Sequence, residues 1–231
     1  MRPEVQAIRA ALDWAEQTAF PANPVARRLR QAEHIEHDGA MLPNLHRTPD
    51  RIADLMGGLI ATRGCRRILE VGTLLGYSAI HLAEAAGPDG HVDSVDIRKP
   101  ERTWGSGDIV RDLHLTTLRL IEESGLASRI TLHAGNSADL LPEMVMAGRS
   151  FEFVYIDGDH RRSAVTLDFI NAVNLLAPGG IIVLDDIDSN IAVNPSSQGG
   201  PNSILPALWA SGRFHLVPVS YRVLVAFDAT G

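Results

Sequence analysis

Residues 68–78 read ILEVGTLLGYS, and this stretch decides the fold. Its apolar opening predicts a buried strand over Arg67–Val71. Gly72 and Gly76 follow at G-x-x-x-G spacing, and a helical pattern then runs over 78–86. A strand that passes through a glycine turn into a helix is the first half of a βαβ unit.

The same alternation of strand and helix continues along the chain. Short apolar runs with β-branched residues alternate with amphipathic stretches, which predicts parallel βαβ units and a doubly wound sheet. The expected strand–helix pairs are 67–71 with 78–86, 91–96 with 109–124, 129–133 with 137–147, 151–156 with 161–176, and 180–184 with 203–211. Pro178-Gly179-Gly180 should end the helix at 161–176, and residues 98–108 resemble an insertion after the second strand.

Both ends of the chain add to this unit. Two apolar runs at 214–219 and 221–227 are almost contiguous, so we expect a hairpin that makes the last strand antiparallel to its neighbour. Three helices are expected before the sheet, at 3–19, 24–37 and 49–63. In the third helix Thr48 is the expected cap, Pro49 fits the first helical position, and Gly64 marks the end.

The predicted fold is therefore α/β: a Rossmann-like, doubly wound, mostly parallel seven-stranded sheet with an antiparallel C-terminal hairpin, plus N-terminal helices. Residues 1–64 would form a helical segment that contacts a substrate or a second copy, which makes a homodimer conceivable. Residues 65–231 would form the ligand-binding core. A length of 231 residues suits one such α/β domain with some decoration.

Composition narrows the partners. The formal charge of -7 argues against nucleic acid and against an anionic membrane surface. The single cysteine, Cys65, permits no intrachain disulfide, which fits a reducing cytoplasm. Acidic residues within Met1–Phe20 argue against a signal peptide or a membrane span. We therefore expect a cytoplasmic protein with a small-molecule partner.

The glycine loop indicates the type of ligand. Its spacing differs from the G-x-G-x-x-G that places a helix N-terminus on a pyrophosphate. S-adenosylmethionine carries no phosphate and needs instead an anion near its sulfonium and ammonium groups, which Glu70 could supply. Other loop residues expected to contact this cofactor are Gly72, Thr73, Gly76, Tyr77 and Ser78. The alternative is a strand–turn–helix with two turn glycines and no ligand.

Two later strand ends add to the expected cofactor site. Asp96 ends the second strand 24 residues after Gly72, about where a carboxylate that binds ribose hydroxyls is expected. After the third strand, Asn136 and Ser137 could meet the adenine edge. Asp96 could instead be a solvated strand end, and Ser137 could instead be a helix N-cap.

Acidic residues follow strands four and five, where IDGDH ends at His160 and LDD ends at Asp186. Strand four should lie beside strand one, and strand five beside strand four, so Asp157, Asp159, Asp185 and Asp186 would gather near the glycine loop. Carboxylates this close repel one another unless something neutralises them. A divalent cation held by oxygen ligands is the simplest remedy, with Mg²⁺ the natural candidate.

Residues 67–187 resemble the class I S-adenosylmethionine-dependent O-methyltransferases of the catechol and caffeoyl-coenzyme A type, and within them bacterial natural-product enzymes that methylate sugars or phenols. The resemblance rests on Ile156–His160 and on APGG at 177–180 followed by Leu184-Asp185-Asp186. It implies methyl transfer to a small-molecule hydroxyl. It also implies that Asp157, Asp185 and Asp186 hold a metal ion and that Glu70, Gly72, Ser78, Asp96, Ser137 and Asp157 line the cofactor site.

Two departures from that family concern the expected chemistry. The catechol-type enzymes have Asp-Asn where this chain has Asp185-Asp186, and a lysine base where it has His160. His160 is the first candidate base, because the unperturbed pKa of histidine suits neutral pH. Asp159 is the second, because sugar-type relatives use an aspartate at that place. Acceptor contacts are expected from residues 44–47 and from a lid at 188–202.

Two other functions remain open on sequence grounds. A non-catalytic or regulatory module that binds S-adenosylmethionine would have no need of the acidic cluster. A nicotinamide oxidoreductase would not be expected to have the glycine spacing or the C-terminal hairpin found here.

Overall fold

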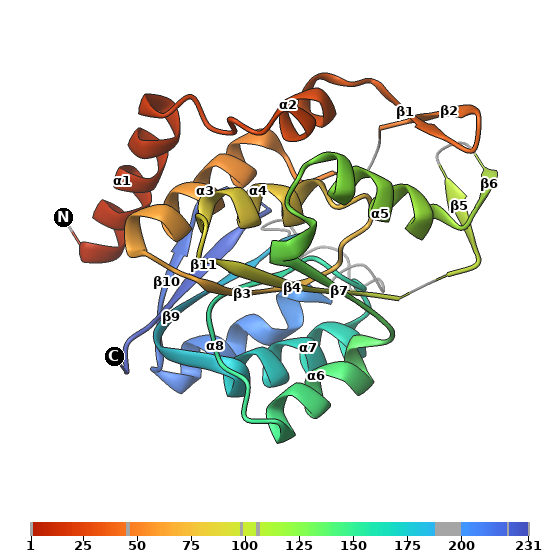
Figure 1. Cartoon of the computed structure of the whole chain (residues 1–231). Helices are drawn as coiled ribbons and strands as arrows, with labels where there is room; N and C mark the ends of the chain where they lie inside the picture. Colours follow the sequence, from red (N-terminus) through yellow and green to blue (C-terminus); the bar gives the residue numbers. More distant parts are fainter. Residues whose placement is uncertain are drawn as a thin grey trace.

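The computed structural model describes residues 2–44, 47–97, 99–104, 107–187, 200–220 and 222–230. A seven-stranded sheet forms its centre, with strand order β10-β11-β9-β8-β3-β4-β7 (Figure 1). The strands are β3 (Arg67–Val71), β4 (His91–Asp96), β7 (Ile130–Ala134), β8 (Phe151–Ile156), β9 (Leu176–Leu184), β10 (Phe214–Pro218) and β11 (Leu224–Asp228). β3, β4, β7, β8 and β9 are parallel, and β11 is antiparallel to both β9 and β10. The predicted mixed sheet with its C-terminal hairpin is confirmed.

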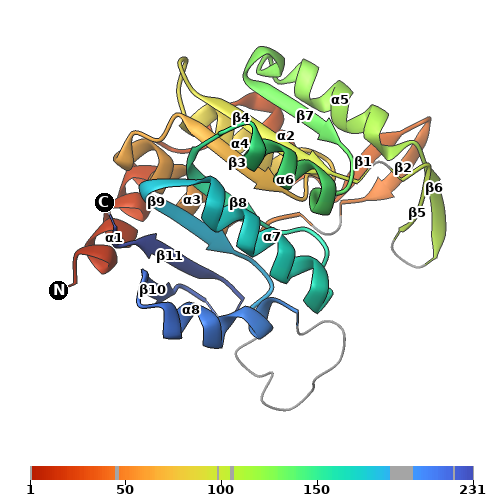
Figure 2. The same cartoon turned by 90° about the horizontal axis from the view of Figure 1, so that it is seen from below.

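Helices cover both faces of this sheet, so the fold is doubly wound (Figures 1 and 2). One face carries α1 (Pro3–Gln17), α2 (Pro24–Gln31), α3 (Asp50–Arg63), α4 (Tyr77–Ala85) and α5 (Leu113–Glu123). The other carries α6 (Ser137–Met146), α7 (Arg162–Leu175) and α8 (Leu205–Ser211), and a 3₁₀ turn at Pro201–Ile204 leads into α8. A second 3₁₀ turn, Ala127–Arg129, joins α5 to β7.

The N-terminal helices share the core of the sheet. A Cβ atom on Gly58 of α3 would lie 2.0 Å from the carbonyl oxygen of Ala11, so α1 and α3 meet at backbone distance. Buried residues of α1 and α3 belong to the same apolar cluster as Ile68 of β3. Residues 1–64 and 65–231 therefore pack as one unit in the structure. Their predicted division into a contact segment and a ligand-binding core stays a prediction. No helix of the described residues is long and apolar enough to cross a membrane.

The prediction of a helix over 24–37 is wrong in its second half. α2 ends at Gln31, and a hairpin follows, with β1 (His34–His37) and β2 (Ala40–Pro43). The side-chain amide of Asn44 donates to the carbonyl oxygens of Leu29 and Ala32, at 2.7 and 2.9 Å. These bonds satisfy carbonyl groups that the end of a helix leaves open, so α2 can stop early.

The expected insertion is a second hairpin, with β5 (Glu101–Trp104) and β6 (Asp108–Arg111). The helix predicted from residue 109 therefore begins only at Leu113. The indole Nε1 of Trp104 donates to the carbonyl oxygen of Pro43 at 2.8 Å, which ties this hairpin to β2. Hairpins this short carry too few alternating residues to be recognised in a sequence.

Two other expected boundaries differ. α7 ends at Leu175, and Pro178-Gly179-Gly180 lies inside β9, which begins at Leu176 instead of Gly180. The N-cap of α3 is Pro49 and not the predicted Thr48. The Thr48 hydroxyl lies instead 3.2 Å from the Tyr155 hydroxyl. Gly64 ends α3 with φ 70°, as predicted.

Candidate active site

A cavity of about 910 Å³ opens at the carboxyl edge of β3, β4, β8 and β9. This edge includes the topological switch between β3 and β8, where ligands of doubly wound sheets bind. Its lining residues at the ends of these strands and of β7 include Gly72, Thr73, Tyr77, Ser78, Asp96, Lys99, Arg102, Asn136, Ser137, Asp157, Asp159, His160, Asp185 and Asp186. Every predicted site residue except Glu70 and Gly76 lies on this wall.

The glycine loop is shaped by two backbone requirements. Gly72 has φ 100°, and a Cβ there would lie 2.0 Å from the carbonyl oxygen of Asp157. Gly72 is therefore needed for close approach to the chain after β8, in addition to any contact with a ligand. Gly76 has φ 78° and is the N-cap of α4.

Asp96 holds this loop in place. Its Oδ2 accepts the backbone N–H groups of Thr73 and Leu74, at 3.0 and 2.7 Å. Its Oδ1 lies 3.5 Å from Nη2 of Arg102 on β5. The carboxylate predicted to bind ribose thus borders the cavity and also fixes the loop.

Glu70 lies below the cavity wall. It is fully buried, and Ser94 donates a hydrogen bond to its carboxylate. Burial raises the pKa of Glu70 to about 7, while Ser78 and Ser94 act to lower it. Glu70 is not among the residues that line the cavity, and its predicted contact with a cofactor stays a prediction.

The other loop residues have local partners. The Tyr77 hydroxyl donates to Asp50 of α3 at 2.8 Å, and burial raises the pKa of Tyr77 to about 12. The hydroxyl groups of Thr73 and Ser94 are 2.5 Å apart. Asn136 is the N-cap of α6, since its Oδ1 accepts from the Ala138 N–H at 3.1 Å. The cap that Ser137 could have supplied is therefore made by Asn136.

The acidic residues meet at a tyrosine that sequence reasoning missed. The Tyr155 hydroxyl lies 2.9 Å from Oδ2 of Asp157 and 2.9 Å from Oδ2 of Asp185. It has one proton and can donate to only one of them at a time. Burial, followed by the charge of Asp157, raises the pKa of Asp185 to about 6. The alternation of side chains along a strand could have indicated Tyr155, because residues 155 and 157 point to the same face of the sheet.

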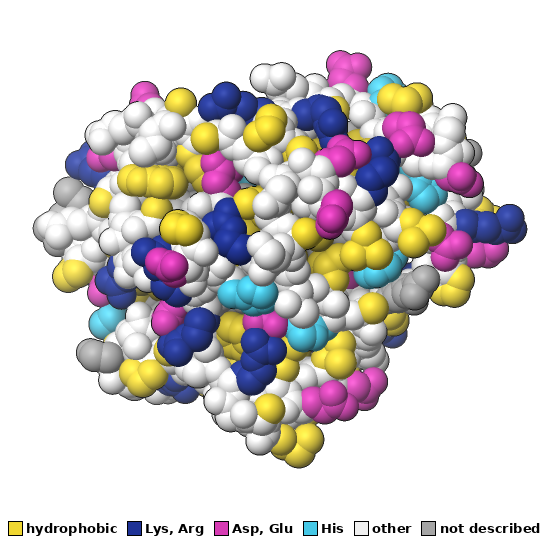
Figure 3. Space-filling model, in the orientation of Figure 1, with side chains coloured by type: hydrophobic (Ala, Val, Ile, Leu, Met, Phe, Trp, Pro, Cys, Tyr) yellow, Lys and Arg dark blue, Asp and Glu magenta, His cyan; other side chains and the backbone are white. Residues whose placement is uncertain are grey.

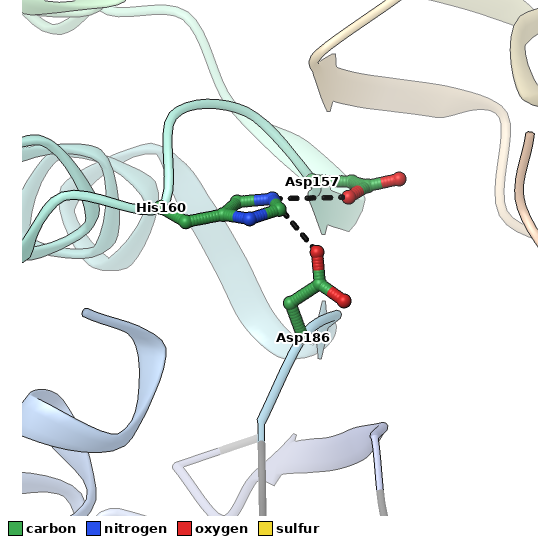
Figure 4. A group of neighbouring side chains, drawn as sticks. All are labelled: Asp157, His160 and Asp186. Atoms are coloured by element: carbon green, nitrogen blue, oxygen red, sulfur yellow. Dashed lines mark ion pairs between the residues drawn. The ribbon is translucent and has the colours of Figure 1, made fainter. Parts of the chain in front are cut away.

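Two cations of the chain itself face the acids. His160 Nε2 lies 2.8 Å from Oδ2 of Asp186 and 3.9 Å from Oδ1 of Asp157 (Figure 4). Arg222 pairs with the other oxygen of Asp186, and its Nε lies 3.5 Å from Oδ1 of Asp185. The repulsion from which a metal ion was predicted is therefore offset, at least in part, by His160 and Arg222.

The environment changes what His160 can do. Hydrogen bonds to Asp157 and Asp186 raise the pKa of His160 to about 10. In this arrangement without a metal ion, the two carboxylates favour the protonated form of His160 at neutral pH, which differs from the unperturbed pKa considered in the sequence analysis. Asp159 faces Arg161 instead, with Oδ2 2.7 Å from the arginine Nε, and this pair lowers the pKa of Asp159.

The donor set fits a divalent cation. Asp157, His160 and Asp186 each present a ligand atom, and all three atoms lie within 4.8 Å of one another. Two carboxylates and an imidazole suit several divalent ions, and Mg²⁺ would favour the oxygens. The predicted ligand Asp185 uses its oxygens on Tyr155 and on the Asp186 N–H.

Two predicted acceptor segments are only partly described. Asn44 and Arg47 line the cavity, and the Arg47 guanidinium lies 5.2 Å from the centre of the Tyr77 ring. Residues 45, 46 and 188–199 lie outside the described residues, so the predicted lid lies largely there. On the face seen in Figure 3, basic and acidic side chains are interspersed.

Known proteins resemble this chain in sequence and in fold. Residues 69–187 match a family model described as a methyltransferase domain. Catechol O-methyltransferase of Mycobacterium tuberculosis is 31% identical over 134 residues, covering 58% of this chain and 52% of that protein. Catechol O-methyltransferase of Niastella koreensis is 28% identical over 151 residues, covering 65% and 60%. The chain thus spans about half the length of the curated relatives it matches.

Solved structures share the fold. An O-methyltransferase from Bacillus cereus, solved in complex with SAH, superposes with a TM-score of 0.72 at 20% identity and covers 94% of this chain and 96% of that one. The resemblance of residues 67–187 and the predicted Rossmann-like fold are thereby confirmed.

Proposed function

Because the chain belongs to the family of methyltransferase domains, we propose that it transfers the methyl group of S-adenosylmethionine to a hydroxyl group of a small molecule. The observation that carries this proposal is the meeting, in one cavity, of the glycine loop after β3 with Asp157, Asp185 and Asp186. The names of the relatives support a phenol or catechol as acceptor. A sugar is the alternative acceptor from the sequence resemblance.

The cofactor is proposed to lie along the carboxyl ends of β3, β4 and β7. Gly72, Thr73, Tyr77 and Ser78 would form the wall against its methionine part, and Gly76 would shape the loop behind that wall. Asp96 would accept from the ribose hydroxyls, and Asn136 and Ser137 would meet the adenine. A cavity of about 910 Å³ has room for this cofactor and a small acceptor together.

Asp157, Asp185 and Asp186 are proposed to hold Mg²⁺ or another divalent cation. When bound there, the ion lowers the pKa of an acceptor hydroxyl and orients it. The protein would contribute alignment of the acceptor oxygen with the methyl group.

The proposed base is His160 or Asp159. His160 must first lose its own proton, because Asp157 and Asp186 raise its pKa to about 10. Those carboxylates are also the proposed metal ligands, so neutralising their charge would return this pKa toward neutrality. Asp159 starts as a carboxylate, but its pairing with Arg161 lowers its pKa and makes it a weaker base.

The test is a panel assay with purified protein. Phenols, catechols and sugars are incubated with S-adenosylmethionine, with and without Mg²⁺, and S-adenosylhomocysteine is quantified. Binding of S-adenosylmethionine without turnover on any acceptor would favour a regulatory module. Binding of NAD instead would favour an oxidoreductase.

We further propose that the protein forms a homodimer through residues 1–64 and is located in the cytoplasm. We propose no nucleic-acid or membrane partner. The buried, free thiol of Cys65 is compatible with a reducing compartment.

A further inference from the structure

The turn between β10 and β11 brings one arginine to the acidic cluster. In the register of β11 with β9, Leu224 pairs with Leu184, which places Arg222 opposite the residues that leave β9. The carbonyl oxygen of Arg222 accepts from the Ile187 N–H at 2.8 Å. Its own N–H donates to the Ser220 hydroxyl at 3.1 Å. The backbone of Arg222 is therefore fixed relative to the exit of β9.

Its guanidinium occupies one side of Asp186. Nη2 donates to Oδ1 of Asp186, while His160 is 2.8 Å from Oδ2. Both oxygens of this carboxylate are thus engaged by cations of the chain. Asp186 is also one of the three residues whose ligand atoms lie within 4.8 Å of one another.

We propose that Arg222 is a built-in competitor of the divalent cation: it holds Asp186 and Asp185 in the metal-free protein and lowers their affinity for the ion. This inference rests on the metal site of the proposed function. A guanidinium cannot be deprotonated under physiological conditions, so the charge of Arg222 can leave Asp186 only by movement of the side chain. That side chain is 40% exposed and lines the cavity, which leaves it room to move.

The direct test measures Mn²⁺ binding to the full chain without cofactor or acceptor. Binding is monitored by the loss of the electron paramagnetic resonance signal of free Mn²⁺. Arg222→Gln removes the charge, and Arg222→Lys keeps it. Arg111→Gln is the control, because among the described ion pairs the exposed Arg111 side chain pairs with Glu101 alone. Arg222→Gln should bind Mn²⁺ on the order of tenfold more tightly than the wild type. Arg222→Lys and Arg111→Gln should stay within about threefold of it.

A second measurement uses the wild type, in case Arg222→Gln does not fold. The ¹⁵Nε–H resonance of Arg222, assigned with Arg222→Lys, should shift when Mg²⁺ is added, because the guanidinium leaves Asp186. The inference is overturned if a folded Arg222→Gln binds Mn²⁺ equally well or more weakly than the wild type. It is also overturned if the Arg222 resonance does not shift at saturating Mg²⁺. Neither result would remove the metal site. If neither wild type nor variants bind Mn²⁺ at millimolar concentration, both the inference and the metal site fail.

Discussion

The Nε2 atom of His160 lies 2.8 Å from Oδ2 of Asp186, and this contact joins the loop after β8 to the exit of β9. The contact raises the pKa of His160 and lowers the pKa of Asp186. The pKa of His160 rises to about 10. Burial acts to raise the pKa of Asp186, but His160 and Arg222 outweigh it and the pKa is lowered.

His160 should therefore stabilise the metal-free protein in a defined pH range. Its pKa in the folded protein lies above the ordinary histidine value of about 6.5, so the stabilisation is complete below about pH 6.5 and is lost as the pH rises toward 10. His160→Gln should lower the Tm in EDTA by roughly 2–4 °C at pH 6, which for this size is about 1 kcal/mol, because partial exposure screens the pair. The difference should vanish near pH 10. His34→Gln, on the exposed part of β1, is the control, and a deficit independent of pH would contradict the ion pair.

Asp96→Ala should weaken S-adenosylmethionine binding. The ribose hydroxyls would lose a charged acceptor worth on the order of 1.5–3 kcal/mol, and Thr73 and Leu74 would lose the carboxylate that holds the loop. Calorimetry measures the loss, with Asp139→Ala as the control because Asp139 is exposed on α6. Unchanged affinity would remove Asp96 from the cofactor site.

Removal of the metal should separate turnover from cofactor binding. EDTA should abolish methyl transfer and leave S-adenosylmethionine affinity largely intact, and Mg²⁺ or Mn²⁺ should restore the rate. Asp157→Asn, Asp185→Asn and Asp186→Asn should each reduce the rate on the order of 100-fold, with circular dichroism showing a retained fold. A full rate in EDTA would mean that the acidic cluster is not a metal site.

Gly72→Ala should destabilise the protein more than Gly64→Ala. Both glycines have positive φ, and a side chain costs about 1–2 kcal/mol in that region. A Cβ at Gly64 meets nothing within 4 Å, whereas at Gly72 it would lie 2.0 Å from the Asp157 oxygen. Urea denaturation should show an extra loss of about 1–3 kcal/mol for Gly72→Ala. Equal losses would show that the loop can move away from β8.

Sequence patterns located the centre of the sheet well. β3, β4 and β8 have the predicted bounds, and in β3 and β8 this follows because strands buried on both faces are nearly continuous apolar runs. The strand order at the switch followed from the rules for doubly wound sheets, and it correctly placed Asp157 near Asp186. The two small hairpins were missed because β1, β2, β5 and β6 have four residues each.

What the sequence could not supply were properties set by neighbours. Arg222 reaches Asp186 through the register of β11 with β9, which no local pattern encodes. Glu70 is buried and accepts a hydrogen bond from Ser94 of the neighbouring strand β4. The pKa of His160 depends on two carboxylates, one of which is on another strand.

The place of β11 has a consequence for synthesis on the ribosome. β11 is the last strand along the chain, yet it lies between β9 and β10 in the sheet. Until residues 224–228 leave the ribosome, the edge of β9 lacks its partner, and Asp185 and Asp186 lack the arginine beside them. The nascent chain must therefore carry an open, apolar strand edge between the synthesis of β9 and that of β11, and such edges invite aggregation and chaperone binding.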